Sequence, residues 1–257
     1  MLDHETARKL REMGLFGMAQ TLAAWENDSE IDSLSFAERF GLLVDAEWTY
    51  RRNRRLERLL REARLRLPAC LEDLELEPAR GLSRQVVRSL ATGRWLQDHQ
   101  NVLVVGPTGV GKTFLACALA NAACRMGFSA RYWRLPRLLA ELAVARGDGS
   151  YRRALARLAR YDLLVLDDLG ISPLSPTECR DLLEIMDDRS GCRSTVVASQ
   201  LPLDSWHSIM GDPTLADAIL DRLVHNAHKI VLKGESMRKI KAGLPQGGDS
   251  AKLETEA

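Results

Sequence analysis

The segment Val102-Leu-Val-Val-Gly106-Pro-Thr-Gly-Val-Gly111-Lys112-Thr113 joins an apolar run to a glycine-rich turn, and the apolar stretch Phe114–Ala120 follows directly. A G-x-x-x-x-G-K-[ST] pattern between a strand and a helix is typical of a loop that wraps phosphate groups. Its glycines let backbone N–H groups point at phosphate oxygens, and the helix N-terminus adds a favourable dipole. Lys112 is expected to reach the β- and γ-phosphates of ATP, and the Thr113 hydroxyl to bind Mg²⁺. The residues predicted to bind the nucleotide here are Gly106, Pro107, Thr108, Gly109, Val110, Gly111, Lys112 and Thr113.

A second apolar run ends in two carboxylates, Leu163-Leu-Val-Leu-Asp167-Asp168. A buried strand of a parallel sheet presents the residues at its carboxyl end to the crevice in which ligands bind. We expect Asp167 to hold Mg²⁺ and Asp168 to orient or activate the attacking water. Two acids after a strand can instead cap a helix. The phosphate-binding loop earlier in the chain favours a role in ATP hydrolysis.

Short apolar runs alternate with amphipathic helices from Asn101 onward, which predicts a parallel sheet covered on both faces. The predicted strands are Val102–Val105, Ala130–Arg134, Leu163–Asp167, Thr195–Ser199 and Lys229–Leu232. An additional strand separates the loop strand from the acidic strand in the chain, as in P-loop ATPases that carry a catalytic acid beside the magnesium ligand. In such a sheet, Ser199 and Gln200 would lie between the loop and the acids. Either side chain could then hydrogen-bond the γ-phosphate or the water; the alternative is an ordinary polar loop.

The chain before the sheet is predicted to be helical. The capping box Ser35–Glu38 begins a helix that is expected to run to Leu67, where Pro68 stops it. We therefore expect an α/β protein in four parts. These are a helical domain that binds DNA or a partner (1–67), a connector with one helix from Ser83 to Asp98 (68–100), an ATPase domain built on a five-stranded parallel sheet (101–242) and a disordered polar tail (243–257).

The end of this predicted helix is strongly basic. From Arg51 to Arg66 there are eight arginines (51, 52, 54, 55, 58, 61, 64 and 66) and two glutamates, a net charge of +6. Arginine forks suit phosphate recognition, so we expect contacts to DNA or to a partner; the alternative is a solvated charged helix. A second basic stretch, 137–160, is predicted to form two helices around Gly147–Ser150. The predicted DNA-binding residues are Arg51, Arg52, Arg54, Arg55, Arg58, Arg152 and Arg153.

The composition gives no overall attraction to nucleic acid, because the net charge of the 257 residues is only +1. A DNA site must therefore come from local clusters such as these arginines. The five cysteines include no C-x-x-C pair, which favours reduced thiols in a cytoplasmic protein. Neither a signal peptide nor an apolar run long enough to cross a membrane is predicted.

Several segments, in this order and spacing, resemble the AAA+ clade of DnaC-type helicase loaders and DnaA-type initiators, and in particular the IstB family of insertion-sequence ATP-binding proteins. They are Leu42–Leu56, Gly106–Thr113, Leu163–Ile171, Val196–Gln200, Ile219–Leu223 and Gly234–Arg238. The resemblance implies that the protein forms a homo-oligomer and that Arg222 is an arginine finger, which reaches the ATP of a neighbouring subunit. It also implies that Arg238 is a second sensor and that Gly81 and Leu82 lie near the adenine. The alternative for both arginines is a surface salt bridge.

On this resemblance we expect a transposition helper that binds ATP and Mg²⁺, assembles on double-stranded DNA and recruits the transposase encoded by the same element. Hydrolysis would drive disassembly or handover of the target. A DnaC-type replicative helicase loader is an alternative, because charge alone does not distinguish an N-terminal module that binds a helicase from one that binds DNA or a transposase. A scaffold that binds ATP without hydrolysing it is another, since Asp168 is shorter than the usual Glu. A metabolic kinase is disfavoured, because no site for a small acceptor molecule is visible.

Overall fold

The computed structural model describes residues 2–25, 31–76 and 80–237. The chain divides into two compact units, Met1–Leu59 and Leu60–Ala257. The connector, predicted as a separate region, therefore belongs to the same unit as the sheet. The predicted tail, 243–257, and the proposed second sensor Arg238 both lie outside the described residues.

The first unit is helical, as the sequence predicts. It contains α1 (Leu2–Glu12), α2 (Phe16–Trp25), the 3-10 turn η1 (Ile31–Ser33) and most of α3 (Phe36–Ala63). The capping box at the start of α3 is present: the Ser35 backbone N–H donates to Glu38 Oε2 at 2.8 Å, and the Glu38 N–H donates to Ser35 Oγ at 3.3 Å. Two of the backbone donors at this helix end, the N–H groups of Ser35 and Glu38, are thereby satisfied.

Helix α2 packs closely on α3 at Gly17. A Cβ atom at this position would lie 2.6 Å from the carbonyl oxygen of Ala46, so the close approach requires glycine. The carboxylate of Glu47 accepts the backbone N–H of Gly17 at 2.7 Å and that of Met18 at 3.3 Å. A buried acid on α3 thus caps the first turn of α2 and fixes the packing of these two helices.

Two predicted helices are shorter in the structure. Helix α3 ends at Ala63 rather than Leu67, because Arg64 adopts a left-handed conformation with φ of 48°, which stops the helix before Pro68 can do so. The helix predicted for Ser83–Asp98 is broken at Gly93, whose φ is 71°. The connector instead contains the 3-10 turn η2 (Leu71–Asp73), α4 (Arg84–Ala91) and α5 (Arg94–Gln97).

The second unit is built on a five-stranded, all-parallel sheet with the order β2-β3-β4-β1-β5. The strands are β1 (Asn101–Val105), β2 (Ala130–Arg134), β3 (Leu163–Leu169), β4 (Ser194–Ser199) and β5 (Ala227–Val231), each within two residues of its predicted bounds. This order places β4 between the loop strand and the acidic strand, as the sequence predicts. Because all strands are parallel, their carboxyl ends meet at one edge of the sheet.

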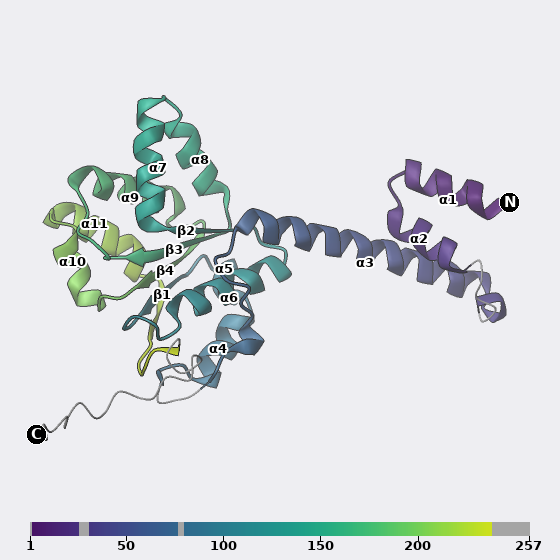
Figure 1. Cartoon of the computed structure of the whole chain (residues 1–257), viewed down its shortest axis with the longest axis horizontal. Coiled ribbons are helices and arrows are strands. Elements are labelled where there is room, and N and C mark those ends of the chain that lie inside the picture. Colours follow the sequence, from purple (N-terminus) through teal and green to yellow (C-terminus); the bar gives the residue numbers. More distant parts are fainter. Residues whose placement is uncertain (1, 26–30, 77–79, 238–257) are drawn as a thin grey trace, which may run out of the picture. The chain divides into compact units, whose positions relative to one another are not determined.

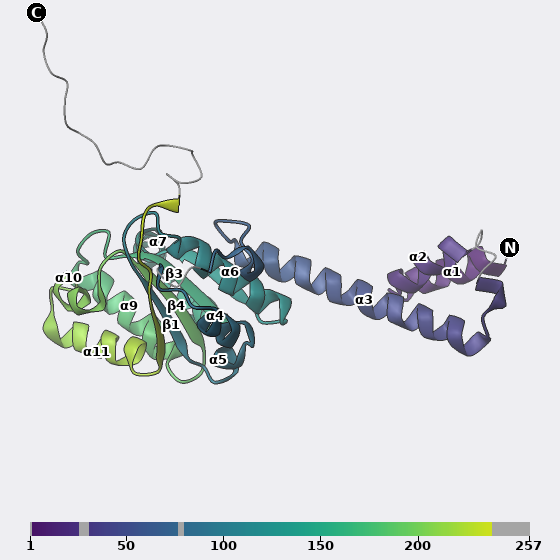
Figure 2. The ribbon, with the colours of Figure 1, turned by 90° about the horizontal axis from the view of Figure 1, so that it is seen from below.

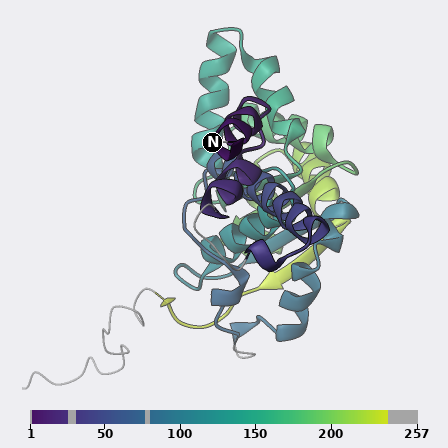
Figure 3. The same cartoon turned by 90° about the vertical axis from the view of Figure 1, so that its right-hand side faces the viewer.

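Helices cover both faces of this sheet (Figures 1 and 2). On one face, α6 (Lys112–Arg125) packs across β1 to β4 with α4 beside it. The other face contributes to a large apolar core with α7 (Leu135–Gly147), α8 (Tyr151–Arg160), α9 (Pro176–Arg189), α10 (Trp206–Ile209) and α11 (Pro213–Val224). The α7–α8 pair, drawn in teal, extends from the sheet in Figures 1 and 3. These two helices surround Gly147–Ser150, as predicted.

Candidate nucleotide-binding site

The loop after β1 has the backbone geometry that its glycines were expected to allow. Gly106 has φ of 152°, and a Cβ atom there would lie 2.3 Å from the carbonyl oxygen of Leu232, beyond β5. Gly111, with φ of 106°, immediately precedes α6. A side chain would be strained at either position. The loop therefore turns tightly into the helix N-terminus, the arrangement that binds phosphate.

Lys112 lies folded inside this loop. Its Nζ atom donates to the carbonyl oxygens of Gly106 and Pro107, each at 2.7 Å, and the side chain is buried. These carbonyls hold the ammonium group at the loop, from which it can turn toward phosphate oxygens. A lysine ammonium binds phosphate as a compact point charge, and the position of Lys112 fits such a role.

Thr113 and Asp167 meet below the loop, although 53 residues separate them in the chain. The Thr113 hydroxyl donates to Asp167 Oδ2 at 2.8 Å, and the Tyr132 hydroxyl donates to the same oxygen at 2.7 Å. Burial, with the Asp167 hydrogen bond second, raises the pKa of Tyr132 and keeps its phenol protonated. A hydroxyl and a carboxylate oxygen this close are the protein ligands that Mg²⁺ prefers.

The described residues include no group of three or more His, Cys, Asp and Glu that could hold a metal unaided. Mg²⁺ commonly binds through only one or two protein oxygens, taking its remaining ligands from phosphates and water. The pair Thr113–Asp167 fits that mode of binding.

The two acids lie at an irregularity of β3. Its pairing with β4 shifts register between Leu166 and Leu169, and Asp168 has φ of 66°. Such bulges redirect side chains and are frequent beside functional sites. Asp168 Oδ2 accepts a hydrogen bond of 2.6 Å from Arg134 Nε at the end of β2. The sequence did not lead us to expect Arg134 or Tyr132 in the site. The two residues are two positions apart on β2, so they lie on the same face of the strand that pairs with the acidic strand β3, and this spacing could have indicated them.

Only one of the two polar residues predicted at the end of β4 faces the site. The Thr108 hydroxyl donates to Gln200 Oε1 at 2.8 Å, so this amide lies beside the phosphate-binding loop. Ser199 is fully buried, and its hydroxyl donates to the carbonyl oxygen of Leu169 at 2.7 Å while accepting the N–H of Leu201. The structure therefore brings Gln200 to the site and uses the Ser199 hydroxyl to join β4 to β3.

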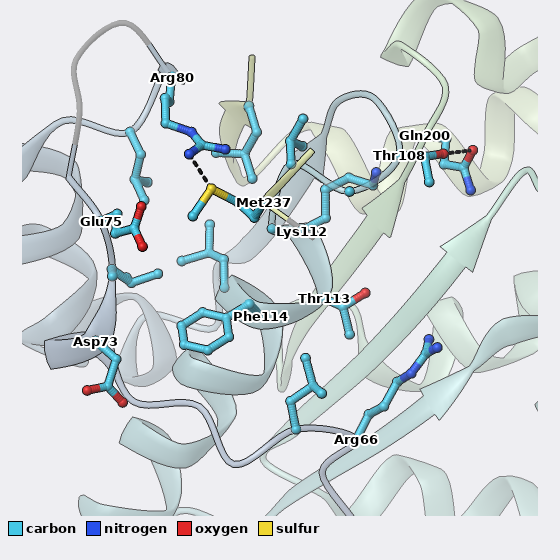
Figure 4. Close-up of a pocket in the computed structure, with 18 of the residues that line it drawn as sticks. Arg66, Asp73, Glu75, Arg80, Thr108, Lys112, Thr113, Phe114, Gln200 and Met237 are labelled. Carbon is cyan, nitrogen blue, oxygen red and sulfur yellow. Dashed lines mark hydrogen bonds between the residues drawn. The ribbon is translucent and has the colours of Figure 1, made fainter. Parts of the chain in front are cut away.

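A cavity of about 750 Å³ extends from these residues toward the connector. Gln200, Arg134 and Asp168 line it together with the loop, and so does Arg66, which the sequence assigned to the basic helix. Its other end is lined by Leu74, Leu82, Phe114, Leu232 and Met237, together with the charged residues Asp73, Glu75 and Arg80. Figure 4 shows Phe114 and Met237 on one side of Lys112, and Gln200 and Arg66 on the other. The cavity thus has a mainly apolar part, with charged residues at its wall, that suits a nucleotide base, and a part beside the loop that suits phosphates.

The connector and the chain after β5 form the wall of the apolar part. Arg80 Nη2 donates to the carbonyl oxygen of Glu235 at 3.1 Å, and Nη1 contacts Met237 Sδ. Of the two residues expected near the adenine, Leu82 lines the cavity. A Cβ atom at Gly81 would meet the carbonyl oxygen of Val231, so this glycine permits the close approach of the two segments.

Arg222, the predicted finger, does not line this cavity. It lies on α11, where its Nη1 donates to the carbonyl oxygen of Ala218 at 2.8 Å and its Nε contacts Asp187 on α9. The predicted DNA-binding arginines are exposed: Arg51, Arg52, Arg54, Arg55 and Arg58 on α3, and Arg152 and Arg153 on α8. Several of the first group already have contacts within α3, such as Arg51 with Glu47 at 2.7 Å and Arg52 over the Trp48 ring.

A parallel sheet in this order, with a phosphate-binding loop after β1 and paired acids on β3, defines an ATP-binding protein of the AAA+ class. The chain belongs to the family of IstB-like ATP-binding proteins, whose family model matches residues 8–243. The predicted family and fold class are both confirmed. None of the helices in the described part of the chain is long and apolar enough to cross a membrane.

Relatives resemble the chain over most of its length. An insertion-sequence ATP-binding protein of Sinorhizobium fredii is 51% identical over 239 residues, covering 93% of this chain and 98% of that protein. The ATP-binding protein of insertion sequence IS21 from Pseudomonas aeruginosa is 35% identical over 214 residues, covering 82% of this chain and 81% of that protein.

Solved structures share the fold at low identity. The DnaC helicase loader covers 64% of this chain with a TM-score of 0.54 and 20% identity, and 97% of its own chain is matched. The replication initiator DnaA, bound to AMPPCP and single-stranded DNA, covers 70% of this chain with a TM-score of 0.56 and 16% identity, and 56% of its own chain is matched.

Proposed function

We propose that this protein hydrolyses ATP while assembled on double-stranded DNA, as the cytoplasmic helper of the transposase encoded by the same insertion sequence. The observation that carries the proposal is the hydrogen bond of 2.8 Å between Thr113 and Asp167, with Asp168 and Gln200 lining the same end of the cavity. A magnesium-binding pair, a second acid and a polar side chain beside the loop are the parts needed to bind ATP and activate water. Names of relatives that refer to insertion sequences support the biological role.

Each residue then has a distinct task. Lys112 leaves the carbonyl oxygens of its own loop and donates to the β- and γ-phosphates. Thr113 and Asp167 hold Mg²⁺, which neutralises phosphate charge and orients the γ-phosphoryl group. Gln200 donates through its amide to the γ-phosphate or the water. Asp168, once released by Arg134, accepts a proton from the attacking water.

Hydrolysis is proposed to require a neighbouring subunit. Arg222 does not line its own cavity, which supports a role at the ATP of another copy. Its contact with Asp187 leaves the guanidinium at the surface, where the side chain retains 32% exposure. A finger in trans stabilises the charge that develops on the transferred phosphoryl group. Arg238 is proposed to contact phosphate within the same subunit.

DNA binding is proposed to use the exposed arginines of α3 and α8. Guanidinium groups on exposed helix faces suit contacts to phosphates, which position a protein on duplex DNA without reading its sequence. In this mode of binding the DNA bases are not expected to stack on aromatic side chains of the protein.

A mixing experiment tests the shared active site. Arg222→Ala should bind ATP almost normally yet hydrolyse it about 10³-fold or more slowly when assembled on DNA. Lys112→Ala should bind ATP too weakly to be active alone. A mixture of the two variants should recover activity, because one subunit supplies the intact loop and the other the intact finger. If a mixture shown to co-assemble stays inactive and wild-type turnover is independent of protein concentration, Arg222 is a surface arginine and the proposed shared site is refuted.

Experiments can distinguish the proposed function from two alternatives, an ATP-binding scaffold and a helicase loader. A scaffold that binds ATP without hydrolysing it is favoured by the contact of 2.6 Å that holds Asp168 on Arg134. Absence of phosphate release with DNA, Mg²⁺ and transposase all present would support it. Selective binding to a replicative helicase, with none to the transposase encoded beside this gene, would instead identify a helicase loader.

A further inference from the structure

Arg66 approaches the acidic pair from the segment that follows α3. Its Nη1 atom lies 3.9 Å from Asp167 Oδ2 and 3.8 Å from Asp168 Oδ2. The side chain is 39% exposed and lines the same cavity as the phosphate-binding loop. Figure 4 shows Arg66 and Thr113 extending into the same part of this cavity. A cation therefore lies where the metal and the γ-phosphate of bound ATP are expected.

This guanidinium belongs to a chain of contacts that ends at the magnesium-binding pair. The neighbouring Tyr132 hydroxyl raises the pKa of Arg66, and the charges of Asp168 and Asp167 act in the same direction. Tyr132 in turn donates to Asp167, which accepts Thr113. The separations of nearly 4 Å from the two carboxylates are longer than direct hydrogen bonds. Charge attracts Arg66 to the acids without locking it there, so the guanidinium can move to a stronger acceptor.

The backbone around Arg66 is anchored within the second unit. Arg131 Nη1, on β2, donates to the carbonyl oxygen of Glu62 in the last turn of α3 at 2.9 Å. Burial raises the pKa of the Cys117 thiol on α6, the helix that begins with the loop lysine, and the nearby backbone of Leu67 and Arg66 lowers it in part. The last turn of α3 is thus tied to the two elements that border the phosphate site. A movement of Arg66 would be passed directly to that turn.

We propose that Arg66 contacts the γ-phosphate of ATP within its own subunit and thereby couples the nucleotide state to the C-terminal end of α3. Without nucleotide, its charge partly balances Asp167 and Asp168. With ATP and Mg²⁺ bound, Asp167 would pair with the metal, and Arg66 would donate to the γ-phosphate oxygens, which are the better acceptor for its guanidinium. ADP lacks those oxygens, so Arg66 distinguishes the two nucleotides. This inference rests on the proposed function, because it requires ATP at this loop.

Nucleotide affinity tests the contact. The full-length protein, dilute and without DNA, is titrated with AMP-PNP and with ADP in the presence of Mg²⁺. Arg66→Ala should lose about tenfold to a hundredfold in AMP-PNP affinity, as expected for a charge-assisted hydrogen bond, with little change for ADP. Arg66→Lys should recover part of the preference because it keeps the charge. Arg88→Ala, which removes an exposed arginine from α4, should leave both affinities unchanged.

Two results would overturn the contact. An equal loss for both nucleotides would mean that Arg66 only supports the fold of the site, and unchanged AMP-PNP affinity would mean that it does not touch the γ-phosphate. A wild-type protein that binds neither nucleotide would refute the proposed function and this inference together, so the two failures are distinguishable.

Hydrogen exchange tests the coupling. In the wild type, AMP-PNP should slow amide exchange of residues 60–67 relative to ADP, and in Arg66→Ala this difference should disappear. Equal exchange with both nucleotides in the wild type would show that the γ-phosphate does not act on the end of α3.

Discussion

The contact between Arg134 and Asp168 predicts that removing an arginine from the site increases the rate of hydrolysis. The hydrogen bond of 2.6 Å from Arg134 Nε occupies Asp168 Oδ2, so this oxygen is not available to the attacking water until the bond breaks. Proton transfer to Oδ2 requires that this bond break first, and its free energy then adds to the barrier. Arg134→Ala removes that contribution to the barrier, because Asp168 Oδ2 then no longer has this hydrogen bond to break.

The size of the effect follows from the exposure of the pair. A hydrogen bond to a charged group contributes about 1.5–3 kcal/mol when shielded from water. Here the side chains of Arg134 and Asp168 are 34% and 16% exposed, so solvent screening lowers the expected value. We take about 1–2 kcal/mol, which corresponds to roughly a 5- to 30-fold rise in turnover.

The assay is phosphate release at saturating ATP and Mg²⁺, with and without duplex DNA. Arg134→Ala should turn over faster than the wild type, Asp168→Asn should be nearly inactive, and the double variant should match Asp168→Asn. Nucleotide affinity, measured in parallel, should be similar in all of them. A fall in the rate of Arg134→Ala would show that Arg134 assists hydrolysis. A double variant that keeps the faster rate would show that Asp168 is not the base.

Further predictions concern binding and stability. Lys112→Ala should reduce ATP affinity by about 2–3 kcal/mol or more, because it removes the ammonium group held at Gly106 and Pro107; unchanged affinity by calorimetry would contradict the role of the loop. Replacing Arg51, Arg52, Arg54 and Arg55 with Ala should lower the slope of log affinity for DNA against log salt by roughly 0.9 per lost phosphate contact. An unchanged slope with lost transposase binding would make this helix a protein-docking surface. Burial raises the pKa of Glu47, but hydrogen bonds from Arg51 and from the Met18 and Gly17 N–H groups outweigh it, so its pKa is lowered. Its stabilising effect is therefore present above the ordinary Glu pKa and lost as pH falls through the lowered value, and the Tm of Glu47→Gln should decrease less on acidification than that of the wild type. Parallel decreases would exclude this contribution.

The parts of the site that could be predicted from sequence are those in which a single short segment of the chain determines both the residues and their geometry. The glycines of the loop, Lys112 and Thr113 form a local pattern whose geometry follows from backbone conformation alone. Asp167 could be assigned because an apolar strand ending in an acid has few positions in a parallel sheet. Gln200 could be predicted from the order of strands in the sheet. It follows β4, and β4 lies between the loop strand β1 and the acidic strand β3.

The parts that sequence reasoning missed depend on pairing between distant segments. Arg134 meets Asp168 only because β2 pairs with β3 in one particular register, which aligns Arg134 with Asp167. Arg66 was counted as the last arginine of a basic helix, because Pro68 was the only visible stop signal. The helix actually ends at Ala63, where Arg64 takes a left-handed conformation that arginine rarely adopts. This early end frees Arg66 to turn toward the site.

These contacts indicate that ATP binding is an exchange of partners at the charged end of the cavity. Lys112 is held by carbonyl oxygens of its own loop, Asp168 by Arg134, and Asp167 by Thr113 and Tyr132. A nucleotide that takes these groups must break existing hydrogen bonds, so its net affinity is smaller than the sum of the new contacts. In return, breaking the bonds of Asp168 and Asp167 frees Arg134 and Tyr132, two side chains of β2. A bound nucleotide can favour one conformation only if its contacts differ between the two conformations. In this site the contacts differ, because the side chains that would bind the nucleotide have other hydrogen-bond partners in its absence.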